Sequence, residues 1–281
     1  MEHILTRLSR RYPQLLLPIS DETKTGEAYK NAVLRGEELT GTPDFTLSER
    51  DSFEVSETPA GSVEVLTLSE RADFEHCIRA LARRCENAVI PPSMGASTIS
   101  GLINWEKIRA HKEEYLLSGG DDWNREFASF TGDSRNYRDT VIVLSRGPYS
   151  ALSPEEAGFE AEEWLSVSHE IRKYHELAHF VSRRLFPENK DAVRDEVLAD
   201  MNGIIAALGH YDGILAGKFL GIRDGKYFPG GRLRNYAAPE ELPEAAERAG
   251  HMIRVLSEDH DAPSAPFEYL LALEERRAFI V

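Results

Sequence analysis

The sequence predicts an α+β fold with a mixed N-terminal half, which contains a small sheet, and a mostly helical C-terminal half. Residues 62–68 and 139–145 are rich in β-branched and aliphatic side chains and are typical of strands. The segments after residue 153 repeat their apolar residues with the period of an α-helix. We therefore expect a mixed region over 1–135 and a helical region over 136–281, either as two units or as one continuous domain.

The elements of the N-terminal half follow from periodicity and from helix-breaking residues. Pro13 interrupts the first apolar pattern, because proline lacks an N–H group. The small-residue stretch 87–101 predicts a loop, which either lines a cleft or simply joins two helices. The expected elements are helices at 2–17, 25–38, 70–87 and 102–117 and a strand at 62–68.

The C-terminal half reads as a series of helices. Ser153 and Pro154 begin a short helix, with a capping side chain and a proline at its first position. Pro187 ends a long helix, and Asn189 or Asp191 can cap the next one. The expected helices are 160–186, 213–220, 239–258 and 265–278, and one further helix runs from the cap at Asn189 or Asp191 to Gly209. A turn-rich loop or hairpin is expected at 223–231.

A metal-binding pattern lies in the long helix. His175, Glu176 and His179 form the sequence H-E-x-x-H. Residues four apart on an α-helix differ by about 40° around the axis and about 6 Å along it, so the two imidazoles can hold one ion. Nitrogen at about 2.0–2.1 Å is a normal ligand of Zn²⁺. Glu176 lies about 100° away, where its carboxylate can take a proton from water that the ion activates.

The following helix can supply the third ligand. If the two helices are antiparallel, His179 and Glu196 are nearly level, because each residue advances a helix by about 1.5 Å. Asp200 lies one turn beyond Glu196, near the level of His175, whose other N–H group it could accept. His169 begins an incomplete second copy of the pattern. It lies about 240° round the helix from His175 and is not expected to bind the ion.

Together the two patterns resemble the gluzincin group of zinc metallopeptidases, in which a thermolysin-like H-E-x-x-H is followed by E-x-x-x-D. The resemblance covers the site alone. It implies zinc ligands at His175, His179 and Glu196, a general base at Glu176 and a supporting carboxylate at Asp200. The metzincin pattern does not fit, because its later glycine and histidine would fall at Ser182 and Leu185.

The strand at 139–145 has two interpretations. In thermolysin-like enzymes an edge strand beside the site pairs with the extended substrate, so the resemblance makes residues 140–145 a candidate for that strand. Composition favours the alternative of a buried central strand, because residues 141–144 form an uninterrupted aliphatic run. The position of this strand in the sheet decides between the two.

The function that these features predict is a zinc-dependent hydrolase, best matched by a metallopeptidase acting on a peptide or protein. Glu176 would take a proton from water and deliver it to the leaving amine. A further donor should stabilise the oxyanion. The downstream candidates are His210, Tyr211, Tyr227, Tyr236 and His251.

The alternative is a non-catalytic binding or regulatory protein in which zinc only holds helices together. A closed fourth ligand would favour this interpretation, because structural zinc sites are closed and catalytic sites keep an open position. Glu176 favours catalysis, because a purely structural site has no use for a base beside the ion.

Charge and hydropathy disfavour other partners. The net charge of −15 repels nucleic acids and anionic lipid surfaces, which need a basic footprint. No apolar run reaches the roughly 20 residues of a transmembrane helix, and the N-terminus lacks the apolar region of a signal peptide. We expect no membrane contact and a cytoplasmic location. Cys77 and Cys85 lie about 12 Å apart on one predicted helix and are expected to be free thiols.

Overall fold

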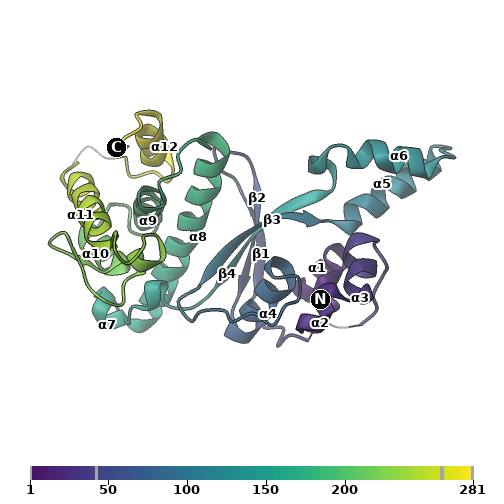
Figure 1. The fold of residues 1–281 in the computed structure, drawn as a ribbon, viewed down its shortest axis with the longest axis horizontal. Helices are drawn as coiled ribbons and strands as arrows, with labels where there is room; N and C mark the ends of the chain where they lie inside the picture. Colours follow the sequence, from purple (N-terminus) through teal and green to yellow (C-terminus); the bar gives the residue numbers. More distant parts are fainter. Residues whose placement is uncertain (1, 42–43, 260–262, 280–281) are drawn as a thin grey trace. The chain divides into compact units, whose positions relative to one another are not determined.

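The computed structural model describes residues 2–41, 44–259 and 263–279. Its class is α+β, as predicted, with one four-stranded mixed sheet and helices that dominate the second half of the chain (Figure 1). The chain divides into two compact units. The first comprises residues 1–56 and 63–145, and the second comprises residues 57–62 and 146–281.

The sheet of the first unit places the strand at 139–145 in its interior. The strand order is β1 (Ser52–Ser56), β2 (Val63–Leu68), β4 (Arg138–Ser145) and β3 (Ala96–Ile103). Because β4 pairs parallel with β2 and antiparallel with β3, it has a partner on each side. The interpretation of residues 140–145 as a free edge for an extended substrate is therefore wrong. The buried aliphatic run from Val141 to Leu144 suits the interior of a sheet.

The stretch 87–101 is not simply a loop, because most of β3 lies within it. The strand carries a bulge between Ser100 and Leu102, where Gly101 adopts a φ of +79°. Glycine tolerates this left-handed conformation, and the small residues beside it hide the alternation of a strand. The strand β1 and the helix α6 (Trp123–Thr131) were not predicted, and no residue of α6 is buried.

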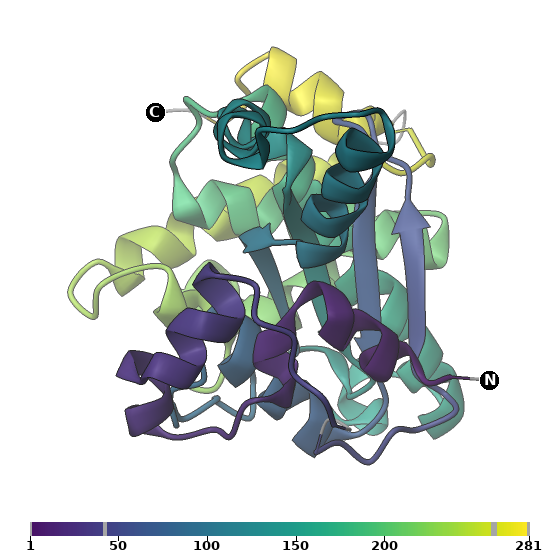
Figure 2. The ribbon, with the colours of Figure 1, turned by 90° about the vertical axis from the view of Figure 1, so that its right-hand side faces the viewer.

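Helices cover the sheet of the first unit and complete its core. α4 (Arg71–Ala82) contacts β2, β3 and β4, and α1 (Ile4–Arg11) adds Leu5 and Leu8 to the same buried cluster. Figure 2 shows the N-terminal helices, in purple, in front of the strands. Cys77 and Cys85 are buried in this core as free thiols, as expected. The other elements of this unit are η1 (Pro13–Leu16), α2 (Asp21–Thr25), α3 (Glu27–Tyr29), η2 (Lys30–Leu34), α5 (Trp105–Leu117) and η3 (Ser134–Asn136).

The second unit is built around two long neighbouring helices, α8 (Ala161–Leu185) and α9 (Ala192–Leu208). Asp191 caps α9, because its carboxylate accepts the N–H groups of Val193 and Arg194. The surrounding elements are η4 (Tyr149–Ala151), α7 (Pro154–Ala157), α10 (Gly213–Leu220), β5 (Ile222–Arg223), β6 (Lys226–Tyr227), η5 (Arg232–Asn235), α11 (Leu242–Glu258) and α12 (Glu268–Glu275). In the described parts of both units, no helix has the length and apolar character needed to cross a bilayer.

Helices α8 and α9 approach closely where Gly203 faces Ile171. A Cβ atom at Gly203 would lie 2.5 Å from the carbonyl oxygen of Ile171, which is closer than real Cβ contacts come. Gly203 follows Asp200 by less than one helical turn, and Ile171 precedes His175 by about one. The absent side chain therefore sets the spacing of the two helices next to the predicted site.

A buried ion pair fastens α12 to α9. Arg194 and Glu274 are each 2% exposed, and Nη1 of the arginine lies 2.7 Å from Oε2 of the glutamate. Asn189 donates to the same carboxylate at 2.7 Å, and Arg194 also donates to the carbonyl oxygen of Ala278. The last helix of the chain is thereby held against the helix that carries Glu196.

Replacing Gly203 with alanine should destabilise the protein by about 1–3 kcal/mol, because the new methyl group overpacks against the backbone of α8. Helix propensity alone predicts the opposite sign, a gain of about 1 kcal/mol. Urea unfolding followed by circular dichroism measures the change in the free energy of unfolding. A stabilised variant would contradict the close approach at this position.

Candidate metal centre

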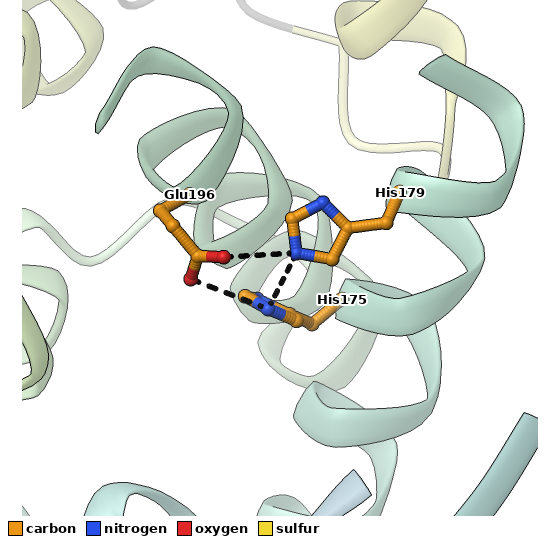
Figure 3. Close-up of side chains that lie close together, drawn as sticks. All are labelled: His175, His179 and Glu196. Atoms are coloured by element: carbon orange, nitrogen blue, oxygen red, sulfur yellow. Dashed lines mark hydrogen bonds and ion pairs between the residues drawn. The ribbon is translucent and has the colours of Figure 1, made fainter. Parts of the chain in front are cut away.

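Two imidazoles and one carboxylate meet between α8 and α9. The Nε2 atoms of His175 and His179 are 3.0 Å apart, and Oε1 of Glu196 lies 3.1 Å from Nε2 of His179. Oε2 of Glu196 lies 3.6 Å from Nε2 of His175. Figure 3 shows the three side chains pointing toward one another from two neighbouring helices. The helical spacing in the sequence leads to this convergence, because it places both imidazoles on one face of α8.

The arrangement fits a metal ion. One ligand atom from each of the three residues lies within 4.8 Å of the others, and all three residues are buried. A tetrahedral ion with bonds of about 2.0–2.1 Å separates its ligand atoms by about 3.3 Å, which is close to the separations in this cluster. Three side chains also leave one tetrahedral position for water or a substrate. The described residues contain no other such group of histidine, cysteine or acidic side chains.

Each histidine of the group has a carboxylate behind it. Oδ1 of Asp200 lies 2.9 Å from Nδ1 of His175, as the position of Asp200 one turn beyond Glu196 led us to expect. Oδ2 of Asp195 lies 2.9 Å from Nδ1 of His179, a neighbour that the sequence analysis missed. An acceptor close to Nδ1 of a ligating histidine favours the tautomer in which Nε2 faces the ion.

Two residues from distant turns complete the site. Arg232 of η5 donates to both oxygens of Asp200 at 2.6 Å, and its Nη1 lies 3.7 Å from Oε2 of Glu196. Tyr149 of η4 places its hydroxyl within hydrogen-bond distance of both His175 and Asp200. Sequence reasoning did not find either residue, because no local pattern connects them to the histidine motif.

The buried charges shift one another's pKa values. Burial disfavours the protonated form of His179, but the carboxylates of Asp195 and Glu196 outweigh burial and raise the pKa of His179 to about 10. Burial would raise the pKa of Glu196, yet the two histidines and Arg232 hold it below its usual range. The pKa of Asp200 is lowered in the same way, since Arg232 and His175 outweigh its burial. Without an ion, both ring nitrogens of His179 therefore carry a proton at neutral pH, and the imidazole is positively charged.

Glu176 lies beside His175 on α8 and is half-buried. Its carboxylate is not part of the three-residue group, and its assignment as a base stays a prediction. His169 also lies outside this group.

The five candidates for an oxyanion donor lie in different surroundings. Tyr236 neighbours Glu196, and burial together with this carboxylate raises the pKa of the phenol. Burial and the charge of Asp200 raise the pKa of Tyr211 in a similar way. His210 and His251 are exposed, and the hydroxyl of Tyr227 donates to the carbonyl oxygen of Gly231. Tyr236 is therefore the candidate that the fold brings next to a predicted ligand.

Comparison with known proteins places the chain in a family. A family model described as a family of unknown function (DUF7005) matches residues 2–259. The match includes α8 and α9 and ends before α12 begins. No curated protein and no solved structure matches the chain. Because no characterised relative indicates the chemistry of the site, that chemistry follows from the geometry of its residues.

Replacing Arg232 with methionine should lower the free energy of unfolding of the metal-free protein by about 3–5 kcal/mol. The reason is that Asp200, which is fully buried, would lose the cation that compensates its charge. Arg234→Met is the matched control, because Arg234 lies in the same short helix and is exposed. The control should change stability by less than about 0.5 kcal/mol, as measured by chemical denaturation. Equal losses at the two arginines would refute the assigned pairing.

Binding of Zn²⁺ at pH 8.5 should release about one proton from His179, because its pKa of about 10 keeps the metal-free imidazole protonated at that pH. The affinity for Zn²⁺ should consequently rise with pH up to that pKa, by roughly tenfold per pH unit. Isothermal titration calorimetry in buffers of different ionisation enthalpy counts the protons. Asp195→Asn, which removes the neighbouring carboxylate, should reduce the count. A binding heat that does not depend on the buffer would contradict the protonated state.

Proposed function

The chain belongs to the DUF7005 family of unknown function, and we propose that this protein is a zinc-dependent hydrolase of the peptidase type. The observation that carries the proposal is the convergence of His175, His179 and Glu196 on one point. Two imidazoles and a carboxylate are the ligand set of thermolysin-type zinc enzymes. The motif-level resemblance to gluzincins, with a glutamate next to the first histidine, supports the same assignment.

A zinc ion held by these three residues would supply a Lewis acid that polarises a carbonyl group and acidifies water. Glu176 is the base that we assign to the reaction. It follows His175 directly on α8, so its side chain lies beside the ligand set. Its carboxylate would take a proton from the attacking water and later donate that proton to the leaving amine, which is the usual cycle of a general base.

The polar residues around the ligands support a hydrolytic site. Tyr236, next to Glu196, has a hydroxyl that could donate to a developing oxyanion. Arg232 donates to both oxygens of Asp200 and so fixes the position of this carboxylate behind His175. A ligand shell held in this way costs little reorganisation when the substrate binds.

Peptides or proteins are the substrate class that we propose, on the strength of the gluzincin resemblance. The competing proposal is a binding or regulatory protein in which zinc only joins α8 to α9. Structural zinc sites have four protein ligands, whereas the group formed by the described residues has three. This count favours the hydrolase.

Glu176→Gln should lower the rate of peptide cleavage by about 10²–10⁴-fold, because the amide cannot accept the proton from water. The experiment uses the full chain, metal analysis of the purified protein and a peptide library read by mass spectrometry. The variant should still bind zinc, since Glu176 is not one of the three ligands.

Glu170→Gln is the matched control for this substitution, because Glu170 is also half-buried on α8 but lies on another side of the helix. It should leave the rate unchanged. Zinc at one per chain without any cleavage would favour the structural role instead. A chain that binds no zinc after gentle purification would refute both proposals.

A further inference from the structure

The hydroxyl of Tyr149 lies directly behind the first histidine of the metal motif. It is 2.9 Å from Nδ1 of His175 and 2.7 Å from Oδ1 of Asp200, and the side chain is 4% exposed. The three polar atoms form a closed triangle, because Oδ1 of Asp200 is also 2.9 Å from Nδ1 of His175. The role of Tyr149 depends on whether its hydroxyl donates to or accepts from each of these two neighbours.

Lone pairs settle the direction of these bonds. Oδ1 of Asp200 accepts hydrogen bonds from the hydroxyl of Tyr149 and from Nη2 of Arg232, which occupies the roughly two lone pairs of that oxygen. The phenol oxygen, whose single proton is already donated, still has lone pairs to offer. The N–H group at Nδ1 of His175 therefore finds its open acceptor in Tyr149.

We infer that Tyr149 is a positioning residue of the metal centre: it accepts the Nδ1–H group of His175 and passes the interaction on to Asp200. The inference rests on the metal-dependent function proposed above. In this arrangement the carboxylate of Asp200 acts on the histidine through the phenol. Tyr149 itself does not touch the substrate, because it sits at Nδ1, and the predicted metal-facing atom of the same ring is Nε2.

The backbone around Tyr149 supports this role. The N–H group of Tyr149 donates to Oγ of Ser168 at 2.9 Å, and Ser168 is fully buried on α8. The next two residues, Ser150 and Ala151, adopt φ values of 53° and 58°. Left-handed conformations are unfavourable for residues with a Cβ atom and persist where the surroundings enforce them, most often at functional sites. The turn keeps this conformation and aims the phenol at the histidine.

The ring of Tyr149 is also fixed by its neighbours. The guanidinium carbons of Arg232 and Arg172 lie 4.8 and 5.5 Å from the ring centroid, and Phe219 packs edge-on at 4.7 Å. Arg172 is itself held, since it donates to the carbonyl oxygen of Pro148 at 3.0 Å. A hydroxyl whose ring is held by packing and by cations is a preorganised acceptor. This is the property that a residue orienting a metal ligand requires.

The test compares Zn²⁺ affinity in the wild-type chain and in Tyr149→Phe, which removes one oxygen atom and keeps the ring. Competition with a chromophoric chelator should show binding about 10–100-fold weaker in the variant. Tyr269→Phe is the matched control, because its hydroxyl donates to a carboxylate, that of Asp259, outside the site. The control should bind Zn²⁺ as the wild type does. Unchanged affinity in Tyr149→Phe would overturn the inference.

A spectroscopic measurement separates positioning from a general loss of structure. The visible absorption of the Co²⁺-substituted protein reports the ligand geometry, so it should change in Tyr149→Phe and stay unchanged in Tyr269→Phe. Asp200→Asn should also weaken Zn²⁺ binding. The double variant Tyr149→Phe/Asp200→Asn should bind Zn²⁺ no more weakly than the single variant that loses the most affinity, because the two residues act in series. Additive losses would show that Asp200 acts on His175 independently, which would overturn the relay.

A second measurement needs no variant. In the zinc-loaded wild-type protein, nuclear magnetic resonance should show a slowly exchanging Nδ1 proton of His175 in contact with the ring protons of Tyr149. The absence of that contact would overturn the inference while leaving the zinc site in place. Failure of the wild-type chain to bind Zn²⁺ would instead overturn the proposed function, and the inference with it.

Discussion

The close packing of α8 against α9 is the constraint on which the candidate site depends. The two imidazoles come from one helix and the carboxylate from the other, so their meeting point exists only in one register of the pair. A slip of one helical turn, about 5.4 Å, would move Glu196 away from His179. Gly203 lets the backbones approach at Ile171, close in sequence to Asp200 and His175. Packing and chemistry are thus set by the same pair of helices.

A second constraint is the balance of charge in a buried site. Glu196 and Asp200 are almost inaccessible to water, and unpaired buried carboxylates cost several kcal/mol each. Arg232 compensates Asp200 and approaches Glu196, while the proton on His179 supplies a further positive charge. A divalent ion that displaces this proton would take over its electrostatic role. The same residues can therefore keep the site folded before and after it is loaded.

The sequence predicts the core of the site because that part is local. His175 and His179 are four apart on one helix, and Glu196 becomes level with them through a short turn whose cap and proline are recognisable. Tyr149 and Arg232 were not predictable, since they reach the site from η4 and η5 through contacts that no periodic pattern encodes. In the sheet, the aliphatic run of β4 was recognised, but its place depended on β3. That strand was hidden by small residues and by the bulge at Gly101.

The ion pair between Arg194 and Glu274 ties the helix of Glu196 to α12. During synthesis α9 leaves the ribosome well before residue 274 does, and chains fold from the N-terminus as they emerge. Until Glu274 arrives, the guanidinium of Arg194 has no carboxylate partner for burial and is better left in water, because an uncompensated buried charge is costly. The helix that carries Glu196 therefore gains this buried fastening only once α12 has been synthesised.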